Sequence, residues 1–485
     1  MNQSVLITFL LYFVFMFGIG IYFYTKSKDL SDYILGGRSL NGWVTALSAQ
    51  ASDMSGWLLL GLPGAAYLGG LEAGWIGIGL LIGTYINWKS IARRFRIYTE
   101  MAGDSITIPD YLENRFGDKS KSLRVISASF ILFFFLIYTS SGFVAGATLF
   151  ETVFGLDYQV ALTIGAILVI SYTFLGGYLA VSWTDFFQGI LMFCAIVIVP
   201  IAGIITLGGF NETIEIVKGV DPLVLNMFKD SSGNSLALIA IISSMAWGLG
   251  YFGQPHILVR FMGIKSADEI KKARVIAMIW VTVCLFSAVA VGIVGKGVVA
   301  DLADAETIFM TMVSLTFHPV IAGILLAAIL AAVMSTADSQ LLVTASAISE
   351  DFYKVLFRKN ATNKELLLVS RLTVIVVAII AYIIASNPSN SVMGLVSYAW
   401  AGFGATFGPV IIMSLYWKKM NRWGALCGLV LGGITTIVFK SLNTPLYEIV
   451  PGFIVAVIAL VVASIITGGA DKVIADKYDS VASKF

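Results

Sequence analysis

The chain has 485 residues, of which 58% are hydrophobic and only 12% carry a charged side chain, with a formal net charge of +2 at pH 7. Soluble domains carry roughly 25% charged residues, so a soluble protein of this length would lack the polar surface to cover its core. Apolar runs of about twenty residues recur from end to end and predict an all-α membrane protein. A β-barrel is disfavoured, because its strands alternate polar and apolar residues over short segments.

The apolar runs define about thirteen candidate transmembrane helices. They are 4–24, 42–68, 70–92, 122–152, 158–176, 179–209, 235–257, 271–298, 317–348, 366–386, 392–416, 422–440 and 446–467. An N-terminus outside the cell and a cytoplasmic C-terminus follow from the basic residues, since cytoplasmic loops are enriched in Lys and Arg. With that orientation, the outward segments hold only four of the 31 basic residues, namely Lys218, Lys229, Lys296 and Lys440.

Cysteine and histidine residues do not form a pattern typical of a metal or redox site. All three cysteines, Cys194, Cys284 and Cys427, fall within apolar segments and predict neither a disulfide framework nor a spaced metal site. The two histidines, His256 and His318, are too few for a zinc or haem site. The scarcity of titratable groups also argues against a membrane enzyme.

Two of the candidate spans contain helix-breaking residues. Ser48 to Ala65 and Ser243 to Ile257 are both rich in Gly, each contains one Pro, and they lie five spans apart. Interrupted spans in matching positions of two units are typical of inverted-repeat transporters, whose binding site lies at the interruptions. The predicted organisation is an extra helix and inward loop (1–41), a first five-helix repeat (42–209), an outward loop (210–234), a second inverted repeat (235–416) and two helices with a cytoplasmic tail (417–485).

Asp53 lies inside the first interrupted span. A carboxylate at the bilayer centre costs about 2.5–3.5 kcal/mol on insertion scales, so it needs a compensating role. It could be a packing residue that accepts hydrogen bonds, or it could hold open an unwound segment and tune a cation site. Gly56 and Pro63 favour the interruption, which would free the carbonyls of Ala51 and Met54 to face a cation.

The candidate span at 317–348 carries small and hydroxyl side chains on one face. Ala332, Ser335, Thr336 and Ser339 are spaced as neighbours on a helix, and Asp338 borders them. Close helix packing explains such a face as well as ion binding does. Opposite an interrupted helix, two hydroxyls and three carbonyls would suit sodium, so the ion site is favoured.

Further candidates are one carboxylate and three aromatic side chains. Asp185, early in the span 179–209, lies either at the cytoplasmic interface or beside Ser339 and Asp338, where it would form a second cation position or an exit path. Tyr138, Trp247 and Tyr251 are either packing residues or an apolar wall for a small ring.

At the level of motifs, the chain resembles the solute:sodium symporter family, and its proline-transporting branch, over nearly its whole length. The motifs are DYILGGRSL, ALSAQASDMSGWLLLGLPGA, YINWK, LAVSWTDFFQ, MAWGLGYFGQPHILVRFM, AGILLAAILAAVMST and GLVSYAWAGFGATFGPV. The resemblance implies a fold of two inverted five-helix units with one cation site between the first interrupted span and the span at 317–348.

Site residues implied by the resemblance follow the family's motifs. The sodium ligands would be the carbonyls of Ala51, Met54 and Ala332 and the hydroxyls of Ser335 and Thr336. Asp53 resembles the carboxylate essential for sodium-dependent binding, and Arg38 matches a position tied to coupling. The positions implicated in holding the substrate are Ser55, Gly56, Tyr138, Trp247, Tyr251 and Pro255. Asp338 departs from the proline branch, where an uncharged residue is expected, so a second sodium at Asp185, Asp338 and Ser339 stays open, as does the stoichiometry.

The implied function is import of L-proline, driven by co-transported sodium, by alternating access across the cell membrane. The expected partners are L-proline, Na⁺ and the lipid bilayer, with no nucleic acid and no obligate protein partner. Two alternatives are carried forward: a sodium symporter of the same family for another amino acid, an organic acid or a sugar, and a sodium channel.

Overall fold

The computed structural model describes residues 3–24, 30–173 and 177–484. Across these ranges the protein is helical, and β-type pairing consists of two isolated bridges, Leu40 with Ile264 and Lys229 with Ser235. Ten helices in the described part of the chain are long and apolar enough to cross a membrane. The all-α membrane class predicted from composition is therefore confirmed.

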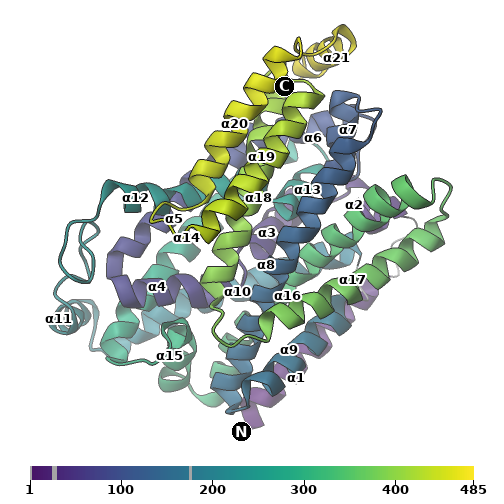
Figure 1. The fold of residues 1–485 in the computed structure, drawn as a ribbon. Coiled ribbons are helices and arrows are strands. Elements are labelled where there is room, and N and C mark those ends of the chain that lie inside the picture. Colours follow the sequence, from purple (N-terminus) through teal and green to yellow (C-terminus); the bar gives the residue numbers. More distant parts are fainter. Residues whose placement is uncertain (1–2, 25–29, 174–176, 485) are drawn as a thin grey trace.

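The helices run roughly along one axis, and the described ends of the chain lie at opposite ends of the molecule (Figure 1). The first half contains α1 (Gln3–Tyr24), α2 (Leu30–Leu35), α3 (Gly42–Asp53), α4 (Leu62–Gly69), α5 (Gly74–Ile86), α6 (Ala92–Met101), α7 (Ile108–Phe116), α8 (Ser122–Phe154), α9 (Tyr158–Thr173), α10 (Tyr178–Thr206) and α11 (Phe210–Val220). The second half contains α12 (Leu238–Met245), α13 (Pro255–Gly263), α14 (Glu269–Val298), α15 (Ile308–Thr316), α16 (Pro319–Ser346), α17 (Asn363–Ala385), α18 (Val392–Tyr416), α19 (Arg422–Ser441), α20 (Ile449–Ile466) and α21 (Lys472–Ala482).

Short 3-10 or π-helical turns join or extend these helices. They are η1 (Gly36–Arg38), η2 (Trp57–Gly61), η3 (Gly70–Ala73), η4 (Asn87–Ile91), η5 (Ala246–Gly253), η6 (Ala305–Thr307) and η7 (Ala347–Phe357). Residues 210–234 were expected as a loop, but they begin with the helix α11, which buries Thr213 and Val217 on one side. The predicted end of the span 158–176 lies partly outside the described residues.

The first interruption falls where the sequence predicts it. α3 begins after Asn41, whose side chain accepts hydrogen bonds from the backbone N–H groups of Trp43 (3.0 Å) and Val44 (3.1 Å). It ends at Asp53, because Met54 leaves the helical region with φ −82° and ψ 72°. The chain resumes helical geometry at Gly56 and continues through η2 into α4. The interruption therefore frees backbone groups at the level of Asp53.

The second interruption is longer and consists of a different kind of backbone. After α12, the chain tightens into the 3-10 turn η5, and Gln254 is extended with φ −76° and ψ 111°. Pro255 then begins α13, a position where its missing N–H costs nothing. Both spans predicted to be interrupted are thus broken near their middle.

Close backbone packing holds the second interruption in place. A Cβ atom added at Gly83 of α5 would lie 2.2 Å from the carbonyl oxygen of Gly248 in η5, and one at Gly79 would lie 2.3 Å from the carbonyl oxygen of Met245. These glycines let α5 and the 3-10 turn touch backbone to backbone, as small residues do between membrane helices. The most buried long helices are α8, α16 and α18 (Figure 1), and α18 packs on both η5 and η2.

We predict that Gly83→Ala destabilises the protein, because its Cβ would press on a backbone atom that cannot rotate away. Overpacking of this kind typically costs about 1–3 kcal/mol. The measurement is the apparent melting temperature of the purified protein, which should fall. Gly18→Ala in α1 is the matched control, since a Cβ there meets nothing within 4 Å. An equal melting temperature for both variants would contradict the packing argument.

Candidate functional site

The Asp53 carboxylate links the two interruptions. It is fully buried at the end of α3, and its Oδ2 accepts a hydrogen bond of 2.7 Å from the hydroxyl of Tyr251 in η5. The backbone carbonyl of Asp53 accepts from the hydroxyl of Tyr138 in α8 and from the Nε1 of Trp57, both at 3.3 Å. Its Oδ1 has no hydrogen-bond partner among the described residues. A residue of the first broken helix is therefore bonded to a residue of the second, next to a carboxylate oxygen that is free to accept.

Four of the five predicted sodium ligands meet between α3 and α16. The Ser335 hydroxyl donates to the carbonyl of Ala51 at 2.8 Å and lies 3.3 Å from the carbonyl of Ala332. The Thr336 hydroxyl also approaches the Ala51 carbonyl, at 3.5 Å. No described hydrogen bond brings the carbonyl of Met54 into this group, although Met54 is buried.

All oxygens in this group are neutral, and a rotated hydroxyl can turn its lone pairs to a cation. Unwound carbonyls and hydroxyls of this kind coordinate alkali ions in transporters with broken helices. The donor set therefore fits sodium, with the carboxyl group of Asp53 only two residues from Ala51.

The predicted substrate residues fall into two neighbouring sets. Tyr138 and Tyr251 flank Asp53 directly, and both are at most 1% exposed. Trp247 lies in a separate aromatic layer, stacked on Tyr447 with ring centroids 5.5 Å apart, and its carbonyl accepts a hydrogen bond from Trp400 Nε1 at 2.7 Å. This layer contacts Tyr251, whose ring packs edge-on against the ring of Trp400 with centroids 5.1 Å apart.

Ser55, Gly56 and Pro255 complete the predicted substrate set, and all three are buried in the two breaks. A Cβ at Gly56 would lie 2.7 Å from the Cβ of Ala145, so α8 approaches the first break closely there. Trp400 was not singled out from the sequence. The signal for it, an aromatic among small residues in SYAWAGFG, is weak without the fold.

Arg260 is the main residue that the sequence interpretation misplaced. The predicted spans 235–257 and 271–298 place it in the inward loop between them, but it lies on α13 and is fully buried. One of its terminal nitrogens is 3.0 Å from Oδ2 of Asp185 in α10, which is fully buried too. Ser48 of α3 donates to the same carboxylate oxygen at 2.7 Å and accepts from the Nε of Arg260 at 3.1 Å. The pair joins α3, α10 and α13 close to the first interruption.

The residues of the predicted second cation position separate into two groups. Ser339 accepts a hydrogen bond from Arg260 and so joins Asp185. Asp338 instead accepts from the hydroxyl of Thr173 in α9 through its Oδ1, while its buried Oδ2 has no partner among the described residues. Asp185 is buried within the bundle, where α3, α10 and α13 meet.

Arg38 lies apart from both groups. Its Nε is 2.9 Å from Oδ1 of Asp104, and its two terminal nitrogens donate to the carbonyls of Met262 at 2.7 Å and Ser105 at 2.9 Å. These partners follow α6 and lie within α13. Arg38 therefore fastens the segment before α3 to the ends of two other helices.

Two broken helices that meet at a buried carboxylate, inside a bundle of membrane-length helices, define a secondary transporter. The sequence model of the sodium:solute symporter family matches residues 33–432. The chain belongs to the sodium:solute symporter family.

Relatives align with almost the entire chain. It is 52% identical over 474 residues to the sodium/proline symporter of Escherichia coli (strain K12), covering 96% of this chain and 93% of that protein. It is 50% identical over 470 residues to the high-affinity proline transporter PutP of Bacillus subtilis (strain 168), covering 95% of this chain and 98% of that protein.

Two solved structures share the fold. A Na⁺-coupled sialic acid symporter in a substrate-bound, outward-open state superimposes with a TM-score of 0.81 at 21% identity, covering 97% of this chain and 99% of that one. Mhp1, a nucleobase-cation-symport-1 family transporter in a closed conformation, gives a TM-score of 0.54 at 15% identity, covering 94% and 99%. The all-helical transporter architecture is therefore shared well beyond close sequence relatives.

We predict that Arg260→Gln strongly destabilises the protein, because it leaves the Asp185 carboxylate buried without its charge partner. Breaking a buried ion pair on one side costs about 3–5 kcal/mol. The apparent melting temperature should drop for Arg260→Gln and recover in large part for Arg260→Gln combined with Asp185→Asn. A double variant no better than the single one would contradict the pairing.

Proposed function

We propose that this chain imports L-proline together with sodium across the cell membrane by alternating access. The observation that carries the proposal is the meeting of Ala51, Ser335 and Thr336 beside Asp53, at the point where both broken helices touch. About half of the residues are identical to those of sodium/proline symporters over nearly the whole chain, which supports proline as the solute and sodium as the co-transported ion.

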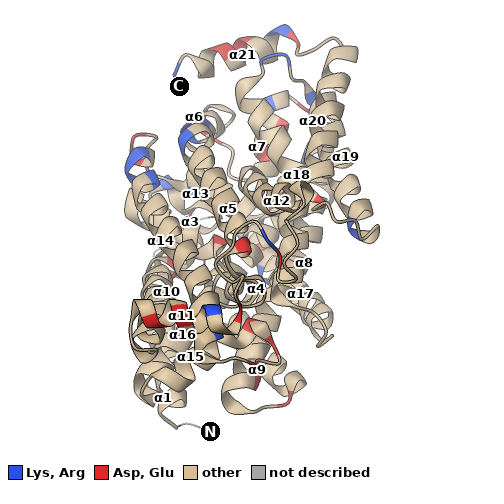
Figure 2. Ribbon diagram, turned by 90° about the vertical axis from the view of Figure 1, so that its left-hand side faces the viewer, with Lys and Arg blue, Asp and Glu red and all other residues tan. Residues whose placement is uncertain are grey.

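In the proposed architecture the chain crosses the membrane thirteen times. Three crossings add to the ten long helices. The run from Trp57 to Met101 turns at Gly70, where φ is +67°, and so serves two crossings. The shorter helix α9 and the broken unit α12–η5–α13 supply the other two. An odd number fits the opposite positions of the two ends. Figure 2 shows most Lys and Arg toward the end with the C-terminus, which supports a cytoplasmic C-terminus and an outside N-terminus.

The inverted repeat also belongs to the proposal. Its two five-helix units would comprise 42–209 and 235–416, each beginning with a broken helix. The bond from Tyr251 to Asp53 supports this pairing, because it joins the first helix of one unit to the first helix of the other. Rocking of one bundle against the other around this point would expose the site to each side in turn.

Within this cycle, sodium binds between α3 and α16 and organises the unwound backbone for the substrate. The proline carboxylate would then meet backbone N–H groups at the half-helix N-termini near Ser55 and Gly56, which favour anions. The pyrrolidine ring of proline would lie against Tyr138, Tyr251 and the aromatic layer that contains Trp247. Asp53 would neutralise the ion, and Pro255 would fix the start of the second half-helix.

A second sodium stays a prediction. Arg260 already gives Asp185 a positive partner through Oδ2, so the oxygens left for another cation would be the unpartnered Oδ1 of Asp185 and Oδ2 of Asp338.

Uptake of labelled proline into proteoliposomes tests the proposed function. We expect accumulation with an inward sodium gradient and little without it. Unlabelled amino acids, organic acids or sugars that compete better than proline would assign another solute. Sodium conduction at channel rates without solute would favour the channel instead.

The sodium site has its own prediction. Removing both hydroxyls, Ser335→Ala with Thr336→Ala, should raise the sodium concentration for half-maximal uptake about tenfold or more, since a hydrogen-bond-like contact to a charge contributes about 1.5 kcal/mol and 1.4 kcal/mol is tenfold. Thr344→Ala on the same helix is the control, because its hydroxyl bonds only to the Gln340 carbonyl of its own helix. An unchanged sodium requirement in the double variant would exclude this site.

A further inference from the structure

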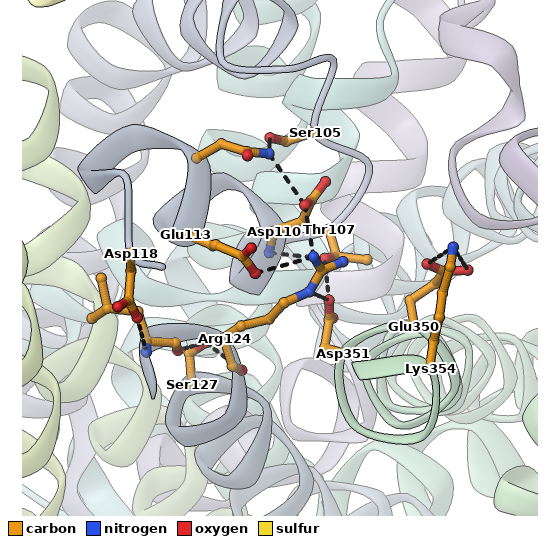
Figure 3. A network of polar contacts seen from close by, with 12 residues as sticks. Ser105, Thr107, Asp110, Glu113, Asp118, Arg124, Ser127, Glu350, Asp351 and Lys354 are labelled. Atoms are coloured by element: carbon orange, nitrogen blue, oxygen red, sulfur yellow. Dashed lines mark hydrogen bonds and ion pairs between the residues drawn. The ribbon is translucent and has the colours of Figure 1, made fainter. Parts of the chain in front are cut away.

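A second polar network lies at the other end of the helix that carries Ser335 and Thr336. Figure 3 shows Arg124, in the first turn of α8, pointing among carboxylates from two other elements. Its Nε is 2.6 Å from Oδ1 of Asp351 in η7. One terminal nitrogen is 3.1 Å from Oε2 of Glu113 and 3.2 Å from Oδ1 of Asp110, both in α7.

Asp351 depends on Arg124 for its charge balance. Its side chain is fully buried, whereas those of Asp110 and Glu113 are 16% and 18% exposed and can draw on water. Apart from Arg124, its Oδ1 accepts only from the Thr107 hydroxyl, at 3.1 Å, and its Oδ2 has no described partner. Without the guanidinium, a buried carboxylate would remain with a single neutral donor, which is strongly unfavourable.

Asp351 connects this network to the proposed sodium site through one continuous helix. α16 passes into η7 without leaving helical geometry, so Ser335, Thr336 and Asp351 lie on the same rod. At 1.5 Å per residue, the ion pair lies about 24 Å along the helix from Ser335. A shift of the η7 end would therefore be carried toward the sodium ligands.

Arg38 holds a different group of elements. Its partners, Asp104, Ser105 and Met262, belong to the ends of α6 and α13, and the backbone pairing of Leu40 with Lys265 (2.8 Å) reinforces that group. Ser105 is the link between the two networks: its carbonyl accepts from Arg38, and its hydroxyl accepts from Asn114 of α7 at 3.0 Å. Arg38 thus joins the segment before α3 to α13 and to the residues that follow α6, whereas Arg124 joins α7, α8 and the α16–η7 rod.

We propose that Arg124 is a positioning residue for sodium-coupled transport, which acts through Asp351 to fix the α16–η7 rod against α7 and α8 so that Ser335 and Thr336 stay in register with Ala51. This proposal rests on the sodium site proposed above. Arg124 touches neither ion nor substrate in it. Its effect is to hold α16, which forms one side of the sodium site, in a fixed position while the elements that Arg38 joins move.

The test compares sodium dependence across a charge-removal series. Arg124→Gln should raise the sodium concentration for half-maximal proline uptake about fivefold or more, a size typical of coupling between sites, with a smaller change in the maximal rate. Adding Asp351→Asn should return the sodium requirement to within about twofold of the parent, because the buried carboxylate is then neutral. A residue that only supported overall stability would change the amount of protein in the membrane, which immunoblotting measures. It would not change the sodium concentration for half-maximal uptake.

Lys418→Gln is the control. Lys418 is also paired with an aspartate, Asp479, but that pair joins the turn after α18 to α21 and involves neither α7, α8 nor η7. The sodium requirement of this variant should equal that of the parent. If Arg124→Gln fails to reach the membrane, Arg124→Lys carries the test, since it keeps the charge but loses the fork that reaches both α7 and η7.

Two outcomes overturn the proposal: a parental sodium requirement in Arg124→Gln at normal abundance, or a raised requirement that Asp351→Asn does not relieve. Failure of the sodium site itself is distinguishable, because the variant lacking both Ser335 and Thr336 hydroxyls would then keep the parental requirement. In that case any effect of Arg124 would have to act elsewhere.

Discussion

The structure depends on one constraint: the Asp53 carboxylate lies where there is no water to solvate it. Only Tyr251 donates to it among the described residues, and that donor belongs to the other broken helix. A hydrogen bond to even one of the two carboxylate oxygens therefore requires the two interruptions to meet. The same contact holds the two interruptions at one level, because it joins the end of α3 to η5.

Bringing two irregular segments together inside a bilayer demands close packing. Glycines provide it, because the 3-10 turn η5 lies against α5 with backbone atoms in contact at Gly83 and Gly248. On the side of η5 that faces α18, the Nε1 of Trp400 donates a hydrogen bond to the carbonyl of Trp247. This carbonyl thereby gains the hydrogen-bond partner that a regular α-helix would have supplied. Irregular backbone is tolerated at this depth only where protein covers it, and these contacts supply that cover.

The sequence predicted the features that leave a local trace. Gly-rich stretches with one Pro each, inside apolar spans, predicted both breaks. The hydroxyl face of α16 predicted the group at Ser335, because the period of a helix alone fixes which residues share a face. Arg260 escaped prediction because a basic residue near the end of an apolar run is the usual sign of a cytoplasmic loop. Its pairing with Asp185, 75 residues earlier, exists only in the packed bundle. The same holds for Trp400 and for Arg124, whose importance rests on which helices become neighbours.

The two buried aspartates near the first break differ in how their charge is balanced, and this difference fits the proposed cycle. Asp185 has a fixed partner, Arg260, on a neighbouring helix, so this corner can stay neutral whether or not an ion is present. Asp53 has no ion-pair partner among the described residues, and its Oδ1 accepts no hydrogen bond there. In the proposed cycle, Asp53 keeps no permanent cationic partner, because a fixed cation would compete with the transported ion. Sodium would then complete the charge balance of this carboxylate only in the loaded state. Coupling between two binding sites is reciprocal. A solute that binds the ordered break therefore raises the affinity for sodium by the same factor by which sodium raises the affinity for the solute.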